Sequence, residues 1–317
     1  IFTCIFSANL KAQEDLSKLF KDTAGRQGRE TVIATFKSPQ IINGQSNETT
    51  PKNDLLFIVM HRFGDIGGSN GGVHNFFGLD NSTDILIGFN YGISDKLSTG
   101  IGRVKGAPNG TGTDQRQLVY LNLKYRLLQQ TEDNYIPVSL TLFGNAAVSV
   151  MEKLDLQTSD AAFTNFSDRM SYISQVIIAR KFNDNVSFAL TPTYVRRNFV
   201  PFMDKNNSFA IGIGGRVKFT KRMAIVADYF HNFRTEESKD YFLSQKNFRF
   251  YDPLGVGLEI ETGGHVFNLI FTNATAILEN QYIPNTSSSW TKGEFRWGFS
   301  ISRTFSLSKD KKNESKW

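Results

Sequence analysis

The sequence predicts a single antiparallel β-barrel that spans a membrane with about twelve strands. Three observations predict it: long stretches in which apolar and polar residues alternate, an even number of such stretches, and connections that are short on one side and long on the other. Alternation with a period of two gives a strand one apolar face and one polar face. Lipid outside a barrel and water inside it require these two faces.

The clearest alternating stretch lies near the C-terminus, where one apolar face runs from Phe295 to Leu307. This stretch is about twice the length of an ordinary soluble strand. Arg303 interrupts the apolar face, and we expect it near the headgroups, where its side chain can reach water. An edge strand of a soluble sandwich is the alternative for this stretch alone. Repetition of the same pattern along the chain favours the membrane barrel.

The alternation defines the expected strands, most of which reach the nine to eleven residues that a tilted strand needs to cross a bilayer. They are 55–63, 84–93, 96–105, 115–128, 135–149, 168–181, 185–197, 207–219, 222–233, 253–262, 264–273 and 293–307. Connections after the even-numbered strands are short, as at Ser94–Asp95. Those after the odd-numbered strands are mostly longer, as at Arg234–Asp252 and Ala274–Lys292. This separation predicts short periplasmic turns and longer extracellular loops.

The composition agrees with many strands and tight turns, because the chain contains 28 Phe and 26 Gly but only 8 Pro. It excludes a helical membrane protein, since no uncharged apolar run of about 18 residues occurs. The formal charge of +6 is modest, and Lys and Arg are spread through the alternating strands. We therefore do not expect a nucleic-acid partner.

The N-terminal region precedes the first expected strand. Residues 1–13 resemble the end of an export signal, and they contain the only cysteine, Cys4. Residues 14–53 form a segment that either stays in the periplasm or folds into the lumen as a plug, with a short amphipathic helix expected at Glu14–Thr23 and a polar linker at Asn43–Asn53. Residues 54–307 form the barrel, and residues 308–317 a polar tail.

Several segments, in a fixed order, carry a family resemblance. They are Ala34–Thr49 (ATFKSPQIINGQSNET), His61–Gly64 (HRFG), Asn75–Asp80 (NFFGLD), Ala179–Phe182 (ARKF), Phe209–Arg222 (FAIGIGGRVKFTKR), Glu261–Ala274 (ETGGHVFNLIFTNA) and Gly298–Phe305 (GFSISRTF). Together they resemble the DUF5777 family of β-barrel proteins from Bacteroidota-type bacteria, over roughly residues 30 to 307. The resemblance implies an outer-membrane location. It implies no activity or catalytic residue, because the family is functionally uncharacterised.

The best functional candidates are charged residues on the polar faces of the strands, which would line the lumen. They are Lys124, Arg126, Arg216, Lys218, Glu259, Glu261 and Arg296. All except Arg296 are expected toward the periplasmic end of the barrel. They predict either a charged constriction that selects small anionic or zwitterionic solutes, or a salt-bridged lumen that passes nothing.

Signals for other chemistry are weak. The histidines at 61, 74, 231 and 265 are scattered and lack metal-ligand spacing. His231 near Asp228 could begin a catalytic set, but nothing resembles a nucleophile elbow. Gly212, Gly214 and Gly215 lie on an expected strand with no helix after it, so they fail as a dinucleotide site. We expect them to relieve crowding or permit bending at the inner wall. We expect no enzyme activity, no cofactor and no metal.

The sequence thus predicts a barrel in the outer membrane of a Gram-negative bacterium, in contact with outer-membrane lipid and lipopolysaccharide. The leading hypothesis for its function is passive passage of small hydrophilic, in particular anionic, solutes. The alternatives are a closed structural or partner-binding barrel and a membrane-embedded lipid-modifying enzyme.

Overall fold

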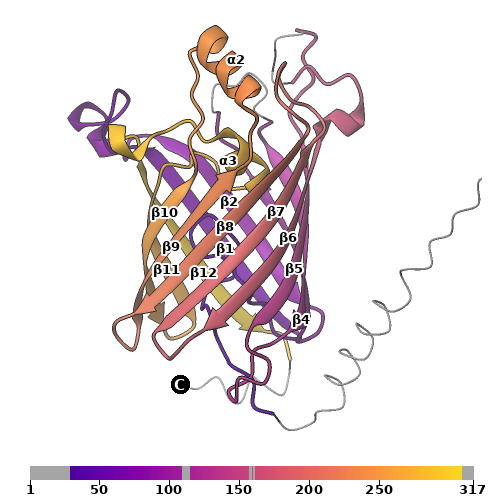
Figure 1. Cartoon of the computed structure of the whole chain (residues 1–317), viewed down its shortest axis with the longest axis vertical. Helices are drawn as coiled ribbons and strands as arrows, with labels where there is room; N and C mark the ends of the chain where they lie inside the picture. The colour runs from indigo at the N-terminus through magenta and orange to yellow at the C-terminus, as the bar shows by residue number, and fades with distance from the viewer. Residues whose placement is uncertain (1–28, 109–114, 157–158, 160, 309–317) are drawn as a thin grey trace, which may run out of the picture.

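The structure, a computed structural model, describes residues 29–108, 115–156, 159 and 161–308. These residues form a closed barrel of twelve antiparallel strands, each paired with its neighbours in sequence, with β12 closing against β1 (Figure 1). The strands are β1 (Asp54–Asp65), β2 (Ser82–Gly92), β3 (Leu97–Val104), β4 (Leu118–Leu128), β5 (Ser139–Ser149), β6 (Met170–Lys181), β7 (Val186–Arg197), β8 (Asn207–Lys218), β9 (Met223–Asn232), β10 (Leu254–Thr262), β11 (His265–Thr272) and β12 (Arg296–Ser306). The predicted fold class and strand number are confirmed.

Alternation of apolar and polar residues sets the two faces of the wall. On β8 the side chains of Phe209, Ile211 and Ile213 are exposed on the outside, whereas Ala210 and Gly212 between them are buried on the inside. The same alternation repeats around the barrel, so its outer surface is apolar although the chain's mean hydropathy is negative. Such a surface is stable against lipid and costly against water.

Several predicted strand ends were wrong by a few residues, for local reasons. The fifth strand was expected from residue 135 but begins at Ser139, because Pro137 has no N–H to donate and Asn134 adopts a positive φ of 55° in the preceding turn. The last strand was expected from residue 293 but begins at Arg296, after Gly293 with a φ of 74°. The turn residues therefore shorten both strands.

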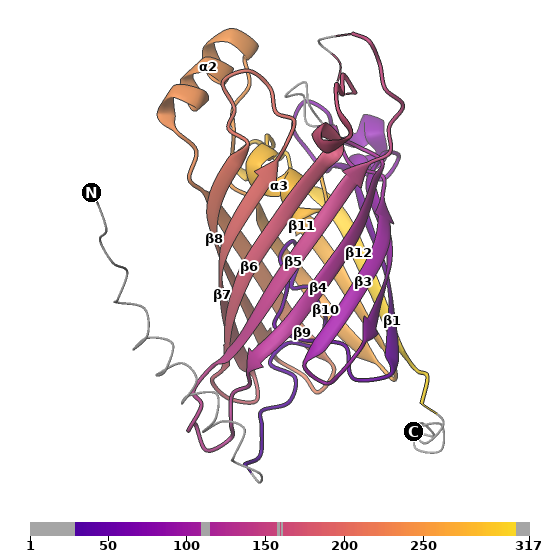
Figure 2. The same cartoon turned by 90° about the vertical axis from the view of Figure 1, so that its right-hand side faces the viewer.

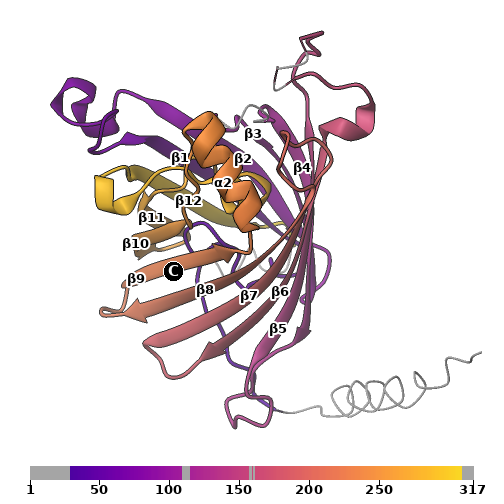
Figure 3. The same cartoon turned by 45° about the horizontal axis from the view of Figure 1, so that its top comes forward.

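The two ends of the barrel differ, as predicted. Four short turns, the longer β4–β5 connection and the segment that leads into β1 lie at one end, and the other connections lie at the opposite end (Figures 1 and 2). The expected short turn at Gln129–Asn134 is longer than predicted, because β5 begins only at Ser139. The loops contain the remaining elements, which are η1 (Val73–Gly78), η2 (Phe166–Arg169), α2 (Glu236–Lys246), α3 (Glu279–Asn285) and η3 (Trp290–Lys292). Figure 3 looks obliquely onto this end, where α2 stands above the opening. None of the described helices combines the length and the apolar composition needed to cross a membrane.

Two segments enter the barrel from opposite ends. The chain before β1 rises into it from the turn end, and residues 40–47 are all buried (Figure 2). The β11–β12 connection enters from the loop end, and every residue of α3 is buried. The sequence predicted an outer loop for Ala274–Lys292, so this part of the prediction was wrong: residues 276–286 fold inward. The signal sequence and the helix expected at Glu14–Thr23 lie outside the described residues.

Candidate functional site

The N-terminal segment forms a hairpin inside the barrel, which we call the plug (residues 31–50). At its tip the amide of Ile41 donates to the carbonyl oxygen of Gly44 at 2.8 Å, and the amide of Ser46 donates to that of Pro39 at 3.0 Å. These bonds satisfy the tip's own backbone, which a buried loop requires. Other polar groups of the tip bond the wall of the barrel and the β11–β12 connection.

Asp228 on β9 holds the tip of the plug. Its Oδ2 accepts the successive backbone amides of Ile42, Asn43 and Gly44 at 3.1, 2.6 and 2.8 Å, and its Oδ1 accepts Asn43 Nδ2 at 2.8 Å. Successive amides that converge on one anion form a backbone nest. The carboxylate is 3% exposed, so these four bonds replace its hydration. Asp228 is therefore the main polar attachment of the plug to the wall.

Other strands hold the plug from other directions. Lys124 on β4, five strands away from β9, donates from Nζ to the carbonyl oxygens of Pro39 and Ser46, both at 3.0 Å. Thr141 on β5 donates to the carbonyl oxygen of Asn47 at 3.1 Å. The plug is therefore attached around the lumen and not along one strand.

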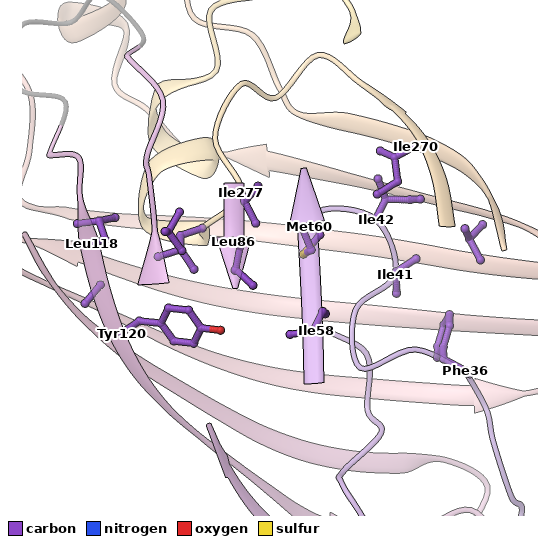
Figure 4. Packing of buried hydrophobic residues seen from close by; sticks show 14 of the residues in the cluster. Phe36, Ile41, Ile42, Ile58, Met60, Leu86, Leu118, Tyr120, Ile270 and Ile277 are labelled. Carbon is purple, nitrogen blue, oxygen red and sulfur yellow. The ribbon is translucent and has the colours of Figure 1, made fainter. Parts of the chain in front are cut away.

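Apolar contacts complete the seat of the plug. Phe36, Ile41 and Ile42 belong to one buried cluster with wall residues and with Ile277 of the β11–β12 connection (Figure 4). Glycines on the inner wall make room for them. A Cβ at Gly214 would lie 2.4 Å from Ile41 Cδ1, and one at Gly255 would lie 2.3 Å from Ile42 Cγ2. The wall is thus hollowed where the two isoleucines fit.

The inward part of the β11–β12 connection, residues 274–289, is called the inner loop. Asp84 on β2 accepts the amide of Ile277 at 2.8 Å, and Arg62 on β1 donates to the carbonyl oxygens of Ala274, at 3.1 Å, and Ala276. Arg62 also donates to Asn43 Oδ1 of the plug at 2.8 Å. The plug and the inner loop are therefore fixed by a shared wall residue.

A direct hydrogen bond also joins the two insertions: Gln45 Nε2 of the plug donates to Glu279 Oε1 of the inner loop at 2.9 Å. Burial raises the pKa of Glu279 above its ordinary value, although Gln45 and Lys124 act in the opposite direction. Burial likewise raises the pKa of Glu48, whose Oε1 accepts the amide of Phe36 at 3.1 Å. Both carboxyls therefore bind protons more tightly in this conformation than they would in water.

Little space remains beside the plug. A cavity between the tip and strands β1, β2, β4 and β5 measures about 20 Å³. That is room for about one water molecule. Along this side of the described barrel, the plug leaves no passage for a larger solute.

A larger polar cavity opens at the loop end, which we call the outer vestibule. It measures about 620 Å³, and its lining includes Lys105, Arg116, Arg296 and Asp65 together with hydroxyl and amide side chains. Arg296 Nη2 donates to Asp65 Oδ1 at 2.5 Å and to Ser288 Oγ at 2.7 Å. Within the described residues, the Nε atoms of Arg116 and Arg296 are buried and have no hydrogen-bond partner. Among the described residues that line the vestibule, three side chains are cationic and one is a carboxylate, which makes this part of the lining suited to anions.

The predicted lumen residues do not form one ring. Arg216 donates from Nε to Glu259 at 2.7 Å and from Nη2 to Glu261 at 3.0 Å, and Glu261 also pairs with Lys37 of the plug at 3.2 Å. Lys124 binds the plug, as described above. The others lie elsewhere: Arg126 bonds the carbonyl oxygen of Asp95 at the rim, Lys218 is half-buried near the end of β8, and Arg296 lines the vestibule at the opposite end.

Asp228, Arg62 and Asp84 are residues that the sequence analysis missed as lumen residues. The signal that could have found them is alternation: each is a charged residue at an inward-facing position of a strand whose other inward residues are mostly apolar or small. The expected approach of His231 to Asp228 was wrong. Residues three apart on a strand face opposite sides, and His231 Nδ1 instead lies 2.8 Å from Asp252 Oδ2. Among the described residues, no group of three or more His, Cys, Asp or Glu side chains could hold a metal.

A closed barrel with an apolar outer wall and a hydrogen-bonded interior defines a membrane-spanning β-barrel protein. The chain belongs to the DUF5777 family, described as a membrane bound beta barrel domain, which matches residues 36–305. The family inferred from the sequence motifs is confirmed. No curated protein matches the sequence.

Solved structures with a similar fold include the COG4313 outer membrane channel from Pseudomonas putida F1, with 11% identity and a TM-score of 0.49 over 82% of this chain and 98% of that chain. The KdgM porin has 8% identity and a TM-score of 0.44 over 80% of this chain and 99% of that chain. The NanC porin has 7% identity and a TM-score of 0.45 over 78% of this chain and 98% of that chain.

Proposed function

We propose that the protein is an outer-membrane channel for small hydrophilic solutes, closed in this conformation by the plug. The observation that supports it most is a separate hairpin seated by hydrogen bonds inside a wall that glycines have hollowed to receive it. The side chains of the wall fill barrels of about eight strands, whereas the lumen of this twelve-stranded barrel is wider and is occupied by separate chain segments. The hairpin continues into the barrel wall at Pro51, and the bonds of Thr31 and Val32 to the β4–β5 connection are few, so it can leave as a unit and return.

The location follows from the architecture. Closed barrels with short turns at one end and long loops at the other are typical of bacterial outer membranes, with the turns in the periplasm. The plug then enters from the periplasm, and the outer vestibule faces the exterior. Lipid and lipopolysaccharide contact the apolar outer wall.

The outer vestibule favours anionic solutes. Lys105, Arg116 and Arg296 line it against one carboxylate, Asp65, and a ring of one sign of charge selects ions of the other sign. The cluster of Arg216, Glu259 and Glu261 contributes little to selectivity, because its charges are buried and paired with one another. We therefore assign anion preference to the vestibule and place the salt-bridged part of the lumen at the periplasmic end.

A closed structural or partner-binding barrel is the second candidate, favoured by the cavity of about 20 Å³ beside the plug. Liposome swelling separates the two, with glucose and gluconate as the probes. A variant that begins at Pro51 should admit both solutes, and gluconate faster. Arg116→Glu in that variant should reverse the preference, whereas Lys205→Glu, on a loop outside the vestibule, should leave it unchanged. A folded but impermeable variant would reject the channel in favour of the closed barrel.

A further inference from the structure

The connection between β1 and β2 carries an exposed apolar surface. Four of its side chains are large and largely solvent-exposed: Val73 (71%), Phe76 (60%), Phe77 (46%) and Leu79 (41%). Between Asp65 and Asp80 this connection contains no Asp, Glu, Lys or Arg. Contiguous apolar side chains that are exposed outside the membrane-spanning wall mark a site of interaction with a protein or a membrane.

The backbone of this connection is compact and holds the two phenylalanines in a fixed position. Phe76 and Phe77 have φ values of 44° and 52°, which L-residues rarely adopt. The amide of Phe77 donates to the carbonyl oxygen of Gly72 at 2.8 Å. A Cβ at Gly78 would lie 2.3 Å from the carbonyl oxygen of Gly64, so only glycine permits this close approach. Strained backbone of this kind clusters at functional sites, which indicates that the outward position of Phe76 and Phe77 is functional.

The position of the connection indicates what the apolar surface meets. It extends the β1–β12 ribbon beyond the barrel, with the amide of Ile66 donating to the carbonyl oxygen of Phe295 at 2.7 Å. Figures 1 and 3 show this purple segment and the yellow η3 projecting sideways from the loop end of the wall, not upward as α2 does.

Both the projection and the wall below it are aromatic. Trp290 of η3 stacks on Phe295 with ring centroids 4.5 Å apart. On the outer face of the next strands, Phe271 and Trp297 lie 4.6 Å apart. Trp and other aromatic residues gather where a membrane meets water, because their rings tolerate both environments. The exposed phenylalanines therefore continue an aromatic band that already faces lipid.

We propose that Val73, Phe76, Phe77 and Leu79 form an anchor that inserts into the outer leaflet beside β1 and β12. The absence of formal charge in this segment removes the cost of bringing it into the interface. The anchor holds the loop ends of β1 and β12 at a fixed depth, next to the strand that leads out of the plug. This assignment is independent of whether the barrel conducts.

The test uses a fluorophore at His74→Cys, an exposed position that leaves all four anchor residues in place, in a Cys4→Ser background. The protein is refolded into dioleoylphosphatidylcholine vesicles with and without phosphatidylcholine spin-labelled near the headgroup. The label at position 74 should lose most of its emission to the spin-labelled lipid, as should a label at lipid-facing Leu121→Cys. A label at Leu243→Cys on α2 should keep its emission. These two controls have similar exposure, 59% and 49%.

Emission at position 74 that stays as high as at position 243 would overturn the proposal, since a water-exposed loop or one covered by protein would both exclude the lipid quencher. A second variant, Phe76→Ser with Phe77→Ser, keeps the glycine framework. It should restore emission at position 74. Quenching that persists in this folded variant would show that the aromatic pair is not the anchor and would also overturn the proposal.

Discussion

Replacement of Asp228 by Asn should release the plug. The carboxylate accepts four hydrogen bonds from Ile42, Asn43 and Gly44 at 2.6–3.1 Å. A hydrogen bond to a charged group is worth roughly 1.5–3 kcal/mol. An asparagine side chain with its oxygen at the Oδ2 position still accepts the three backbone amides, but as a neutral group. Its NH₂ group then faces Asn43 Nδ2, which is itself a donor, so that bond is lost.

The loss of one such bond and the weakening of the other three from charged to neutral strength together come to about 3–6 kcal/mol, and the lower cost of burying a neutral side chain offsets part of it. We therefore expect the docked plug to be destabilised by about 3 kcal/mol, which shifts the equilibrium between docked and released plug roughly a hundredfold. The fold of the barrel should survive, because the ladder hydrogen bonds of β9 to β8 and β10 do not involve this side chain.

Protection of a cysteine in the plug measures this equilibrium. Ser46 is fully buried and differs from cysteine by one atom, so Ser46→Cys in a Cys4→Ser background should react slowly with a bulky maleimide. Asp228→Asn should accelerate the reaction roughly a hundredfold, in proportion to the released fraction. The matched control is Asp184→Asn on the β6–β7 turn, whose side chain is 98% exposed. Equal protection in a folded Asp228→Asn barrel would refute the role of Asp228 as the plug's attachment.

Three further predictions use the same cysteine. Lys124→Met removes both bonds from Nζ to the plug and should weaken docking by about 2–4 kcal/mol, seen as faster labelling. Gly255→Ala places a Cβ 2.3 Å from Ile42, which should cost about 1–3 kcal/mol of docking through overpacking. Gly263→Ala, where a Cβ would meet nothing within 4 Å, is its control, and equal labelling of the two would contradict the fit of the plug. Acidification should stabilise the closed conformation, because burial raises the pKa of Glu279 and of Glu48 in the docked state. The docked state then gains protons and stability as the pH falls through these raised values, and loses that stability as the pH rises. Because the thiolate is the form that reacts, each rate is divided by the rate of an exposed cysteine at Asp184→Cys at the same pH. A lower ratio at pH 5 than at pH 7, with a smaller difference in Glu279→Gln, would agree; a higher ratio at pH 5 would contradict it.

The wall of the barrel could be predicted from the sequence because each strand carries its own signal. The alternation along β8 or β12 depends only on which side of the strand faces lipid, and that information is local. The strand ends were less accurate, since Pro137 and Gly293 act through hydrogen bonding and backbone conformation that alternation does not record.

The contents of the lumen could not be predicted in the same way, because they depend on partners far apart in the sequence. The polar residues around Asn43 suggested a linker, but the partner of Asn43 is Asp228, 185 positions away. The inner loop was expected outside the barrel because it belongs to the connection between β11 and β12, which joins these strands at the loop end. Its apolar residues at Ala276–Leu278 and at Tyr282–Ile283 were the signal that could have placed it inside. The inward direction of Arg216 was evident from parity, whereas its pairing with Glu259, 43 positions away, required the tertiary structure.

The central claim is that the plug closes a channel, and single-channel recording in a planar bilayer tests it most directly. The full chain and the variant that begins at Pro51 are compared under a salt gradient. We predict that the full chain is closed for most of the record. The shortened barrel should conduct steadily, with a reversal potential that indicates a preference for anions. A shortened barrel that is folded yet electrically silent would contradict the claim, as would equal steady conductance in both chains.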